Sequence, residues 1–293
     1  MKALEIKNLK KYFGRVKAVD GISFEINEGE IFGFLGPNGA GKTTTIRCLM
    51  DFIRPDVGEI NILGLDAQEN SVELKSKVGY LASEPRLYDD WTGKEHIDLI
   101  NGIRGKEDHS AELIEKLGAD INTKIKNLST GNRRKISLIL ALTHDPQLVI
   151  MDEPTIGLDP LLKNTMYEVL LEMSEKGKTI FMSSHDLSEV ERVCTRAAII
   201  REGKLAAVEN IGKLNAKRLY HIWIKLDPEK ELMNLSKISG VEVESETPSE
   251  ATFSVAGDID PVIKFLAKAK IDDVKIEHAG LEETFMKFYE KEK

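Results

Sequence analysis

The residues with the most specific chemistry form a glycine-rich segment near the N-terminus. Eight consecutive residues fit the pattern G-x-x-x-x-G-K-[ST]: Gly36, Pro37, Asn38, Gly39, Ala40, Gly41, Lys42 and Thr43. The glycines let the backbone curl so that its N–H groups point at phosphate oxygens. Lys42 would pair with the β- and γ-phosphates, and the hydroxyl of Thr43 would ligate Mg²⁺. With Thr44 as its last member, the segment predicts a site for a nucleoside triphosphate and Mg²⁺.

Two adjacent carboxylates, Asp152 and Glu153, directly follow an apolar run at residues 148–151. A phosphate-binding loop needs a carboxylate for its metal ion. Open α/β sheets bind ligands beyond the carboxyl ends of their strands. We expect Asp152 to hold Mg²⁺ through water and Glu153 to act as general base toward a water molecule. Acidic residues also end many strands without such a role, so this assignment depends on the phosphate loop. Together the two motifs predict a nucleoside triphosphatase.

The elements around these motifs are those that such a site needs. Near-continuous apolar runs at 30–36, 148–153 and 178–184 are typical of buried parallel strands. Helical patterns at 42–53 and 160–177 alternate with them, and this alternation predicts a parallel sheet. The helix that opens at Lys42 would add its positive N-terminal end to the phosphate site. Alternating runs near the N-terminus indicate an additional antiparallel layer.

Further motifs, in their order along the chain, narrow the class of enzyme. Between the phosphate loop and Asp152 lies a signature-like segment: Leu128, Ser129, Thr130, Gly131 and Asn132. With it, roughly residues 1–215 resemble the ATP-binding subunit of an ATP-binding cassette (ABC) transporter. The family usually has Leu-Ser-Gly-Gly-Gln there, so Thr130 and Asn132 are departures.

The resemblance implies that two cassettes enclose ATP and Mg²⁺ head to tail. The signature segment of one subunit would then reach the γ-phosphate bound by the other. Local sequence alone equally fits an ordinary helix with a Ser129 cap. Asp159 matches the D-loop at the dimer interface, although Asp-Pro is also a common helix start. His185 matches the switch histidine, which would sense the γ-phosphate and help to orient the hydrolytic water.

Two further positions take their roles from the resemblance. Tyr12 matches the aromatic residue that stacks on adenine, with the alternative that either Tyr12 or the adjacent Phe13 packs on the sheet instead. Ser83 stands where the family has a glutamine that touches Mg²⁺. Its hydroxyl could still bind the ion directly or through water, or Glu84 could substitute. This departure puts the full hydrolytic rate in question, but not nucleotide binding.

The implied fold is α/β, a P-loop cassette with a mixed sheet, an antiparallel β layer and a helical subdomain at about 84–145. In the family this subdomain receives a coupling helix of the membrane subunit. Tyr88 and Trp91 could contact that helix or pack locally. The remaining histidines have no metal-ligand spacing and are interpreted as structural: His96, His109, His144, His221 and His278.

The sequence changes character near residue 215. From there a strand–helix–strand–strand–helix–strand order predicts a small ferredoxin-like α+β domain over 216–293. The segment 280–285, GLEETF, is similar to tails of the exporter branch of the family, whose permease subunits are separate chains. We expect Phe285, Met286 and Tyr289 to pack on their own domain.

Composition limits the remaining possibilities. The 293 residues carry a net charge of −8, which does not suit a nucleic-acid binder. No apolar run approaches the ~18 residues of a membrane span, so no direct insertion is expected. Cys48 and Cys194 are too few for a disulfide framework, and we expect both in the core of a cytoplasmic protein. A permease on separate chains would hold it at the cytoplasmic face of the membrane.

The leading hypothesis is therefore the ATPase subunit of an exporter, acting as a homodimer or with a related cassette. Two alternatives are a weakly hydrolysing regulatory cassette, suggested by Ser83 and the altered signature, and a soluble cassette ATPase acting on ribosomes or DNA. The second has little support, because the chain shows one cassette and neither a heptad run nor a basic face.

Overall fold

The computed structural model divides the chain into two compact units, residues 1–208 and 209–293. The dividing point lies within several residues of the boundary predicted near 215. The structure describes most of the first unit and parts of the second, namely residues 1–104, 109–212, 219–226, 240–247, 249–268 and 271–279.

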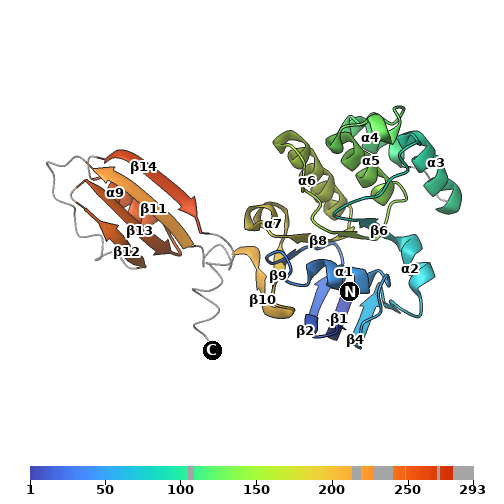
Figure 1. The fold of residues 1–293 in the computed structure, drawn as a ribbon, viewed down its shortest axis with the longest axis horizontal. Coiled ribbons are helices and arrows are strands. Elements are labelled where there is room, and N and C mark those ends of the chain that lie inside the picture. The colour runs from blue at the N-terminus through green and yellow to red at the C-terminus, as the bar shows by residue number, and fades with distance from the viewer. Residues whose placement is uncertain (105–108, 213–218, 227–239, 248, 269–270, 280–293) are drawn as a thin grey trace. The chain divides into compact units, whose positions relative to one another are not determined.

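A central sheet of six strands, in the order β10–β9–β3–β8–β7–β6, organises the first unit (Figure 1). The strands are β3 (Ile31–Leu35), β6 (Val78–Leu81), β7 (Leu148–Met151), β8 (Thr179–Ser184), β9 (Arg196–Arg201) and β10 (Lys204–Asn210). β3 pairs in parallel with β8 and β9, and β7 pairs in parallel with β6 and β8. All residues of β3, β7 and β8 are buried, which explains their apolar sequences. Their carboxyl ends meet at one edge of the sheet.

A second, antiparallel sheet has the order β2–β1–β4–β5 and confirms the predicted antiparallel layer. Its strands are β1 (Lys2–Phe13), β2 (Val16–Asn27), β4 (Val57–Ile62) and β5 (Leu65–Asp66). Phe24 of β2 stacks on Phe32 and Phe34 of the central sheet, with ring centroids 5.5 Å apart in each pair. Phe181 of β8 completes this aromatic cluster, 6.1 Å from Phe24. The core therefore lies between the two sheets.

The helices of the first unit lie between its strands along the chain. They are α1 (Lys42–Leu49), α2 (Ser71–Lys77), α3 (Gly93–Arg104), α4 (Ser110–Leu117), α5 (Thr130–Leu142), α6 (Pro160–Glu175) and α7 (Leu187–Val193), with a 3-10 turn at Ile125–Asn127. Figure 1 shows α3, α4 and α5 together on the side of the central sheet away from the antiparallel sheet. They occupy the segment 84–145 for which a helical subdomain was predicted. None of the helices described is long and apolar enough to cross a bilayer.

The second unit contains a four-stranded antiparallel sheet in the order β12–β13–β11–β14. Its elements are β11 (Leu219–Leu226), β12 (Val241–Glu246), β13 (Glu250–Ala256), α9 (Asp260–Leu266) and β14 (Ile271–His278). Val262 and Leu266 of α9 pack on Ile222 and Phe253 of the sheet. Neighbouring first and third strands suit a split β-α-β-β-α-β unit. The first of its two helices was expected at 228–240, nearly all of it outside the described residues, so the ferredoxin-like assignment stays a prediction.

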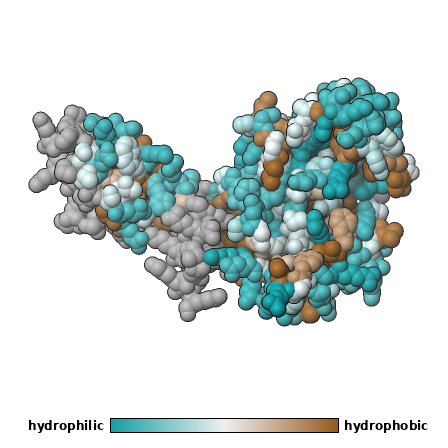
Figure 2. Space-filling model, viewed as in Figure 1, coloured by the Kyte–Doolittle hydropathy of each residue, from teal (hydrophilic) through white to brown (hydrophobic). Residues whose placement is uncertain are grey.

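Several smaller expectations concern burial. Cys48 and Cys194 are buried, as predicted, and burial raises the pKa of the Cys48 thiol to about 11. The expected packing of Phe285, Met286 and Tyr289 lies outside the described residues. On the face of the first unit that Figure 2 shows, hydrophobic side chains are interspersed among hydrophilic ones.

Candidate functional site

The phosphate loop joins β3 to α1, and its backbone requires glycine at both ends. A Cβ on Gly36 would lie 2.3 Å from the carbonyl oxygen of Ile200. A Cβ on Gly41 would lie 2.3 Å from the carbonyl oxygen of Ala18, and the φ of Gly41 is +110°. Both contacts are with backbone atoms, which cannot rotate away as a side chain does. The glycines of the motif therefore allow the loop to pass close to neighbouring strands.

Lys42 is the first residue of α1, and its ammonium group lies inside the loop. Its Nζ donates to the carbonyl oxygens of Gly36, at 2.6 Å, and Pro37, at 3.2 Å. The same nitrogen lies 3.0 Å from Oε1 of Glu153. Buried charges in proteins are normally paired, and this cation has a carboxylate and two carbonyl dipoles around it. Lys42 is the residue predicted to pair with the phosphates of a nucleotide.

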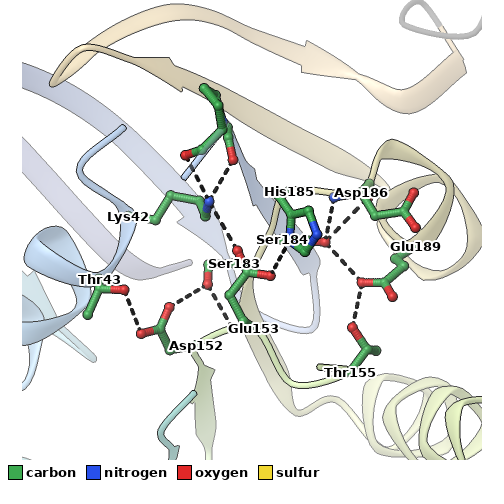
Figure 3. A network of polar contacts seen from close by, with 12 residues as sticks. Lys42, Thr43, Asp152, Glu153, Thr155, Ser183, Ser184, His185, Asp186 and Glu189 are labelled. Atoms are coloured by element: carbon green, nitrogen blue, oxygen red, sulfur yellow. Dashed lines mark hydrogen bonds and ion pairs between the residues drawn. The ribbon is translucent and has the colours of Figure 1, made fainter. Parts of the chain in front are cut away.

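Asp152 and Thr43 come together at the carboxyl edge of the central sheet (Figure 3). Thr43 Oγ1 donates to Oδ2 of Asp152 at 2.8 Å, and Ser183 Oγ donates to Oδ1 at 2.7 Å. Hydroxyl and carboxylate oxygens are the ligands that Mg²⁺ prefers. The residues present thus fit a magnesium ion held by Asp152 and Thr43 beside the phosphates.

Glu153 lies between Lys42 and His185 and is almost completely buried. Its Oε2 is 2.8 Å from Nδ1 of His185, while its Oε1 faces Lys42. An ionised carboxylate only accepts, so Nδ1 of His185 carries the proton in this contact. The φ of Glu153 is +47°, in the left-handed region, and its N–H donates to Ser183 Oγ at 2.9 Å. A carboxylate so placed can accept a proton from a water molecule.

A pocket of about 560 Å³ opens beside these groups. Residues of the phosphate loop, the β1–β2 hairpin and the strand ends line it: Val16, Lys17, Ala18, Asn38, Gly39, Ala40, Gly41, Lys42, Thr43, Thr44, Ser83, Glu84, Glu153, Ile156, Glu202 and Gly203. Ser83 and Glu84, the two residues considered in place of the family's glutamine, are both among them. Glu153 and Ser83 therefore line one pocket with the phosphate loop. Asp152 and His185 do not line it, but they contact two residues that do, Thr43 and Glu153.

Tyr12 does not line this pocket, although the hairpin that follows it does. Its hydroxyl donates to Oδ1 of Asp20 at 2.5 Å. This hydrogen bond raises the pKa of Tyr12 and lowers the pKa of the Asp20 carboxyl. The neighbouring Phe13 is 51% exposed. The predicted stacking of Tyr12 on adenine thus remains a prediction.

The signature segment caps α5 away from the pocket of its own chain. Ser129 is the N-cap of α5, as its sequence predicts, and its Oγ accepts from the N–H of Asn132 at 3.2 Å. The side chain of Asn132 binds the backbone N–H and carbonyl of Asp120, at 2.9 and 2.7 Å. Asn132 therefore fixes a neighbouring loop, while Ser129 and Thr130 are exposed.

Asp159 is likewise an exposed helix cap. Its Oδ1 accepts from the N–H of Leu162 at 2.9 Å, and Pro160 begins α6. Neither Asp159 nor the segment Leu128–Asn132 lines the pocket around Lys42. Both sets of residues lie on the surface, where a second molecule can reach them.

Tyr88, Trp91 and His96 form a local aromatic group at the start of the helical subdomain. The Tyr88 and Trp91 rings lie 4.9 Å apart, and both pack against the ring of His96. The N–H of Tyr88 donates to Nε2 of His96 at 3.0 Å, and Nδ1 of His96 lies 2.7 Å from the carbonyl oxygen of Thr92. His96 is buried with both nitrogens in use, which agrees with the structural role expected for it.

Three polar residues near the site were missed by the sequence analysis: Arg134, Ser183 and Glu189. Arg134 is buried on α5 and donates to carbonyl oxygens around Glu153. Glu189 is buried on α7, where Oε2 accepts from Ser184 and Thr155 and Oε1 from Lys163. No local signal distinguishes Arg134 or Glu189 in the sequence, because Arg134 lies between Arg133 and Lys135 and Glu189 lies two residues before Glu191.

Sequence comparison with known proteins finds relatives among the ATP-binding proteins of ABC transporters. The family model described as "ABC transporter" matches residues 19–156. An uncharacterized ABC transporter ATP-binding protein of Methanocaldococcus jannaschii is 34% identical, over 92% of this chain and 97% of that protein. The Nod factor export ATP-binding protein I of Paraburkholderia xenovorans is 32% identical, over 97% of this chain and 96% of that protein.

A solved structure supports the same comparison for the fold. The structure of an ATP-binding subunit of an ABC transporter superposes with a TM-score of 0.68 at 28% sequence identity. The match covers 73% of this chain and 92% of that one.

Proposed function

The chain belongs to the ATP-binding proteins of ABC transporters, and we propose that it powers an exporter by ATP-driven, head-to-tail dimerisation. Membership of the family makes it an ATP-binding cassette with ATPase activity. The observation that carries the proposal is the position of Glu153, between Lys42 and His185 and next to the phosphate loop.

The residues of the phosphate loop and the strand ends have roles that follow from their contacts. Lys42 and the loop N–H groups bind the phosphates. Thr43 and Asp152 would hold Mg²⁺, with Ser83 as a further oxygen ligand, and the ion would supply positive charge beside the phosphates. Glu153 takes a proton from the attacking water, and His185 holds the Glu153 carboxylate and orients that water near the γ-phosphate. Stabilising charge and positioning the nucleophile are the main requirements of phosphoryl transfer.

Dimerisation brings in the residues that lie outside the pocket. Ser129 and Gly131 at the start of α5 present a helix N-terminus, which favours anions such as a γ-phosphate. Ser129 and Asp159 are exposed and do not line the pocket of their own chain. This supports their action on the nucleotide bound by a partner subunit, either a second copy or a related cassette.

The permease partner has a candidate binding groove where the helical subdomain meets β6 and the segment that follows α1. This groove of about 400 Å³ includes Phe52, Tyr80, Ile100, Arg104 and Leu140 among its lining residues. The Nη1 of Arg104 is buried and makes no hydrogen bond to the described residues. A short helix of a permease could fill the apolar groove and accept from this nitrogen. Export is proposed from the similarity to the Nod factor export protein. Attachment at the cytoplasmic face of the membrane is proposed because the permease partner would hold the cassette there.

Ser83, which lines the pocket where the family has a glutamine, favours a second candidate function. In that function the chain is a weakly hydrolysing regulatory cassette. A serine hydroxyl is shorter than a glutamine side chain, and Thr130 and Asn132 also depart from the family pattern. Turnover of Mg·ATP by the purified chain separates the two functions. A kcat near the enzyme median of about 10 s⁻¹ supports the motor, and a kcat lower by about 10³ supports the regulator.

The experiment that tests dimerisation is light scattering of Glu153→Gln with and without Mg·ATP. We expect the mass to double on addition of ATP, because the nucleotide is bound but not hydrolysed. The double variant Lys42→Ala/Glu153→Gln is the control and should stay at its starting mass. A Glu153→Gln chain that binds ATP and stays monomeric would contradict the homodimer and leave the related cassette as partner.

A further inference from the structure

We propose that Arg134 is a positioning residue that holds the backbone of Glu153 and connects it to the helix beginning at the Ser129 cap. The inference deepens the proposed function, since it rests on Glu153 as the general base. Arg134 is buried, lies outside the signature segment 128–132 and does not line the nucleotide pocket, so neither gives it a role.

The guanidinium group of Arg134 joins two strand ends. Its Nη2 donates to the carbonyl oxygen of Glu153 at 2.9 Å, and its Nε donates to that of Pro154 at 3.2 Å. Its Nη1 donates to the carbonyl oxygens of Ala82 and Ser83, both at 2.8 Å. Arg134 is only 6% exposed, and burial lowers its pKa. Four carbonyl dipoles thus surround one buried cation, an arrangement that uses the planar fork of an arginine.

Glu153 needs such support because of its backbone conformation. Its φ of +47° lies in the left-handed region, which is disfavoured for residues with a Cβ. Such a conformation persists only where surrounding contacts impose it. The Glu153 N–H is bound by Ser183 and its carbonyl by Arg134, one contact on each side of the Cα atom. The direction of the carboxylate therefore depends on both contacts.

The same guanidinium connects Glu153 to two other parts of the site. Arg134 lies in the first turns of α5, five residues after Ser129. It also holds the carbonyl of Ser83, whose residue lines the nucleotide pocket. A displacement of the start of α5 by a bound phosphate would move the guanidinium and, with it, the Glu153 peptide. Arg134 thus transmits a movement of the signature segment to the general base, Glu153, of the same chain.

The test compares Arg134→Gln and Arg134→Lys with Lys135→Gln, in the full chain. Lys135 is the next residue of α5, and its Nζ contacts only the carbonyl of Gly118 among the hydrogen bonds described. We expect both Arg134 variants to lower kcat for Mg·ATP by about 100-fold, the loss typical of a misplaced catalytic group, with KM for ATP nearly unchanged. Lys135→Gln should keep the wild-type kcat. Arg134→Lys retains the charge and provides a folded variant if Arg134→Gln does not fold.

A double-mutant cycle with Glu153→Gln identifies the route of the effect. The measured quantity is the single-turnover rate of ATP hydrolysis. If Arg134 acts through the Glu153 carboxylate, adding Arg134→Lys to Glu153→Gln should lower this rate little further. The same fold-loss in both backgrounds, an unchanged kcat, or a rise in KM alone would overturn the positioning role. Wild-type turnover by Glu153→Gln would instead refute Glu153 as base, so failure of the proposed function is distinguishable.

Discussion

The ammonium group of Lys42 lies 3.0 Å from Oε1 of Glu153, and both side chains are almost completely buried. The cation expected to bind phosphate and the carboxylate expected to activate water therefore form one ion pair. A phosphate bound by Lys42 competes with Glu153 for the same charge. We expect nucleotide binding to weaken this ion pair and to free the carboxylate for its contact with water.

Lys42→Ala should weaken ATP binding by roughly 30- to 150-fold. The change removes charge-assisted hydrogen bonds to phosphate, which contribute about 2–3 kcal/mol. Isothermal titration calorimetry gives the Kd directly. Lys176→Ala, at the end of α6, is the control for loss of one positive charge and should bind ATP as the wild type does. Equal affinities of the Lys42 variant and wild type would refute the phosphate-loop assignment.

Glu153→Gln should lower kcat by about 100- to 1,000-fold, because an amide cannot accept the proton of the attacking water. Its Kd for ATP should stay close to wild type or become tighter, since the competition for Lys42 is weakened. Glu202→Gln, a carboxylate that lines the same pocket, is the matched control and should retain turnover. Phosphate release measures kcat, and a comparable loss in both variants would point to pocket charge rather than a base.

Tyr12→Ala should weaken ATP binding by roughly tenfold, since stacking of a base on an aromatic ring contributes about 1–3 kcal/mol. Tyr12→Phe keeps the ring and should bind nearly as well. The competing assignment is tested by Phe13→Ala, which is expected to leave the Kd unchanged. If Phe13→Ala weakens binding and Tyr12→Ala does not, Phe13 is the ring that contacts adenine.

Tyr12→Phe should also change how stability depends on pH. The Tyr12 hydroxyl lowers the pKa of Asp20 from its usual 3.8 and raises that of Tyr12 from 10.0. Stability from the lowered carboxyl pKa is present above pH 3.8 and is lost as pH falls through the folded pKa. Stability from the raised phenol pKa is present below pH 10.0 and is lost as pH rises through the folded pKa.

The wild type should therefore exceed Tyr12→Phe in free energy of unfolding at neutral pH, with the difference shrinking toward both extremes. Urea unfolding at pH 3, 7 and about 10.5 measures it. A difference that does not vary with pH would show that the hydrogen bond is unimportant and that the hydroxyl acts by packing.

Gly36→Ala should destabilise the protein by about 1–3 kcal/mol, the range for a forced close contact, and weaken nucleotide binding. Its Cβ would lie 2.3 Å from the Ile200 carbonyl oxygen. Gly102→Ala on α3 meets no atom within 4 Å and should stabilise the chain slightly, because alanine favours helix. Thermal unfolding of both variants measures the contrast, and similar melting temperatures would contradict the close approach.

The sequence predicted those parts of the site that are local in the chain. The phosphate loop follows β3, Asp152 and Glu153 follow β7, and His185 follows β8. Each motif lies directly after an apolar run, and parallel strands bring such ends to one edge. The cap at Ser129 and the start of α6 at Pro160 were equally predictable, because helix ends have their own residue preferences.

What the sequence could not predict depends on contacts between distant segments. Arg134 and Ala82 are 52 residues apart in sequence, and Ser183 and Asp152 are 31 apart. Nothing near Arg134 in the chain indicates that it faces two strand ends. Asn132 was known as a departure from the family pattern, but its hydrogen bonds to Asp120 depend on a loop 12 residues away. Such pairings require the folded arrangement of the helices.

The phenylalanine cluster between the two sheets has a consequence for cooperativity. Phe24 of the antiparallel sheet is fixed against Phe32, Phe34 and Phe181, on the strands that precede the phosphate loop and His185. Opening the outer sheet would expose all four rings to water at once, and large aromatic surfaces make this costly. We therefore expect the outer sheet and the nucleotide site to unfold together. Hydrogen exchange of amides in β2 will report on the integrity of the ATP site.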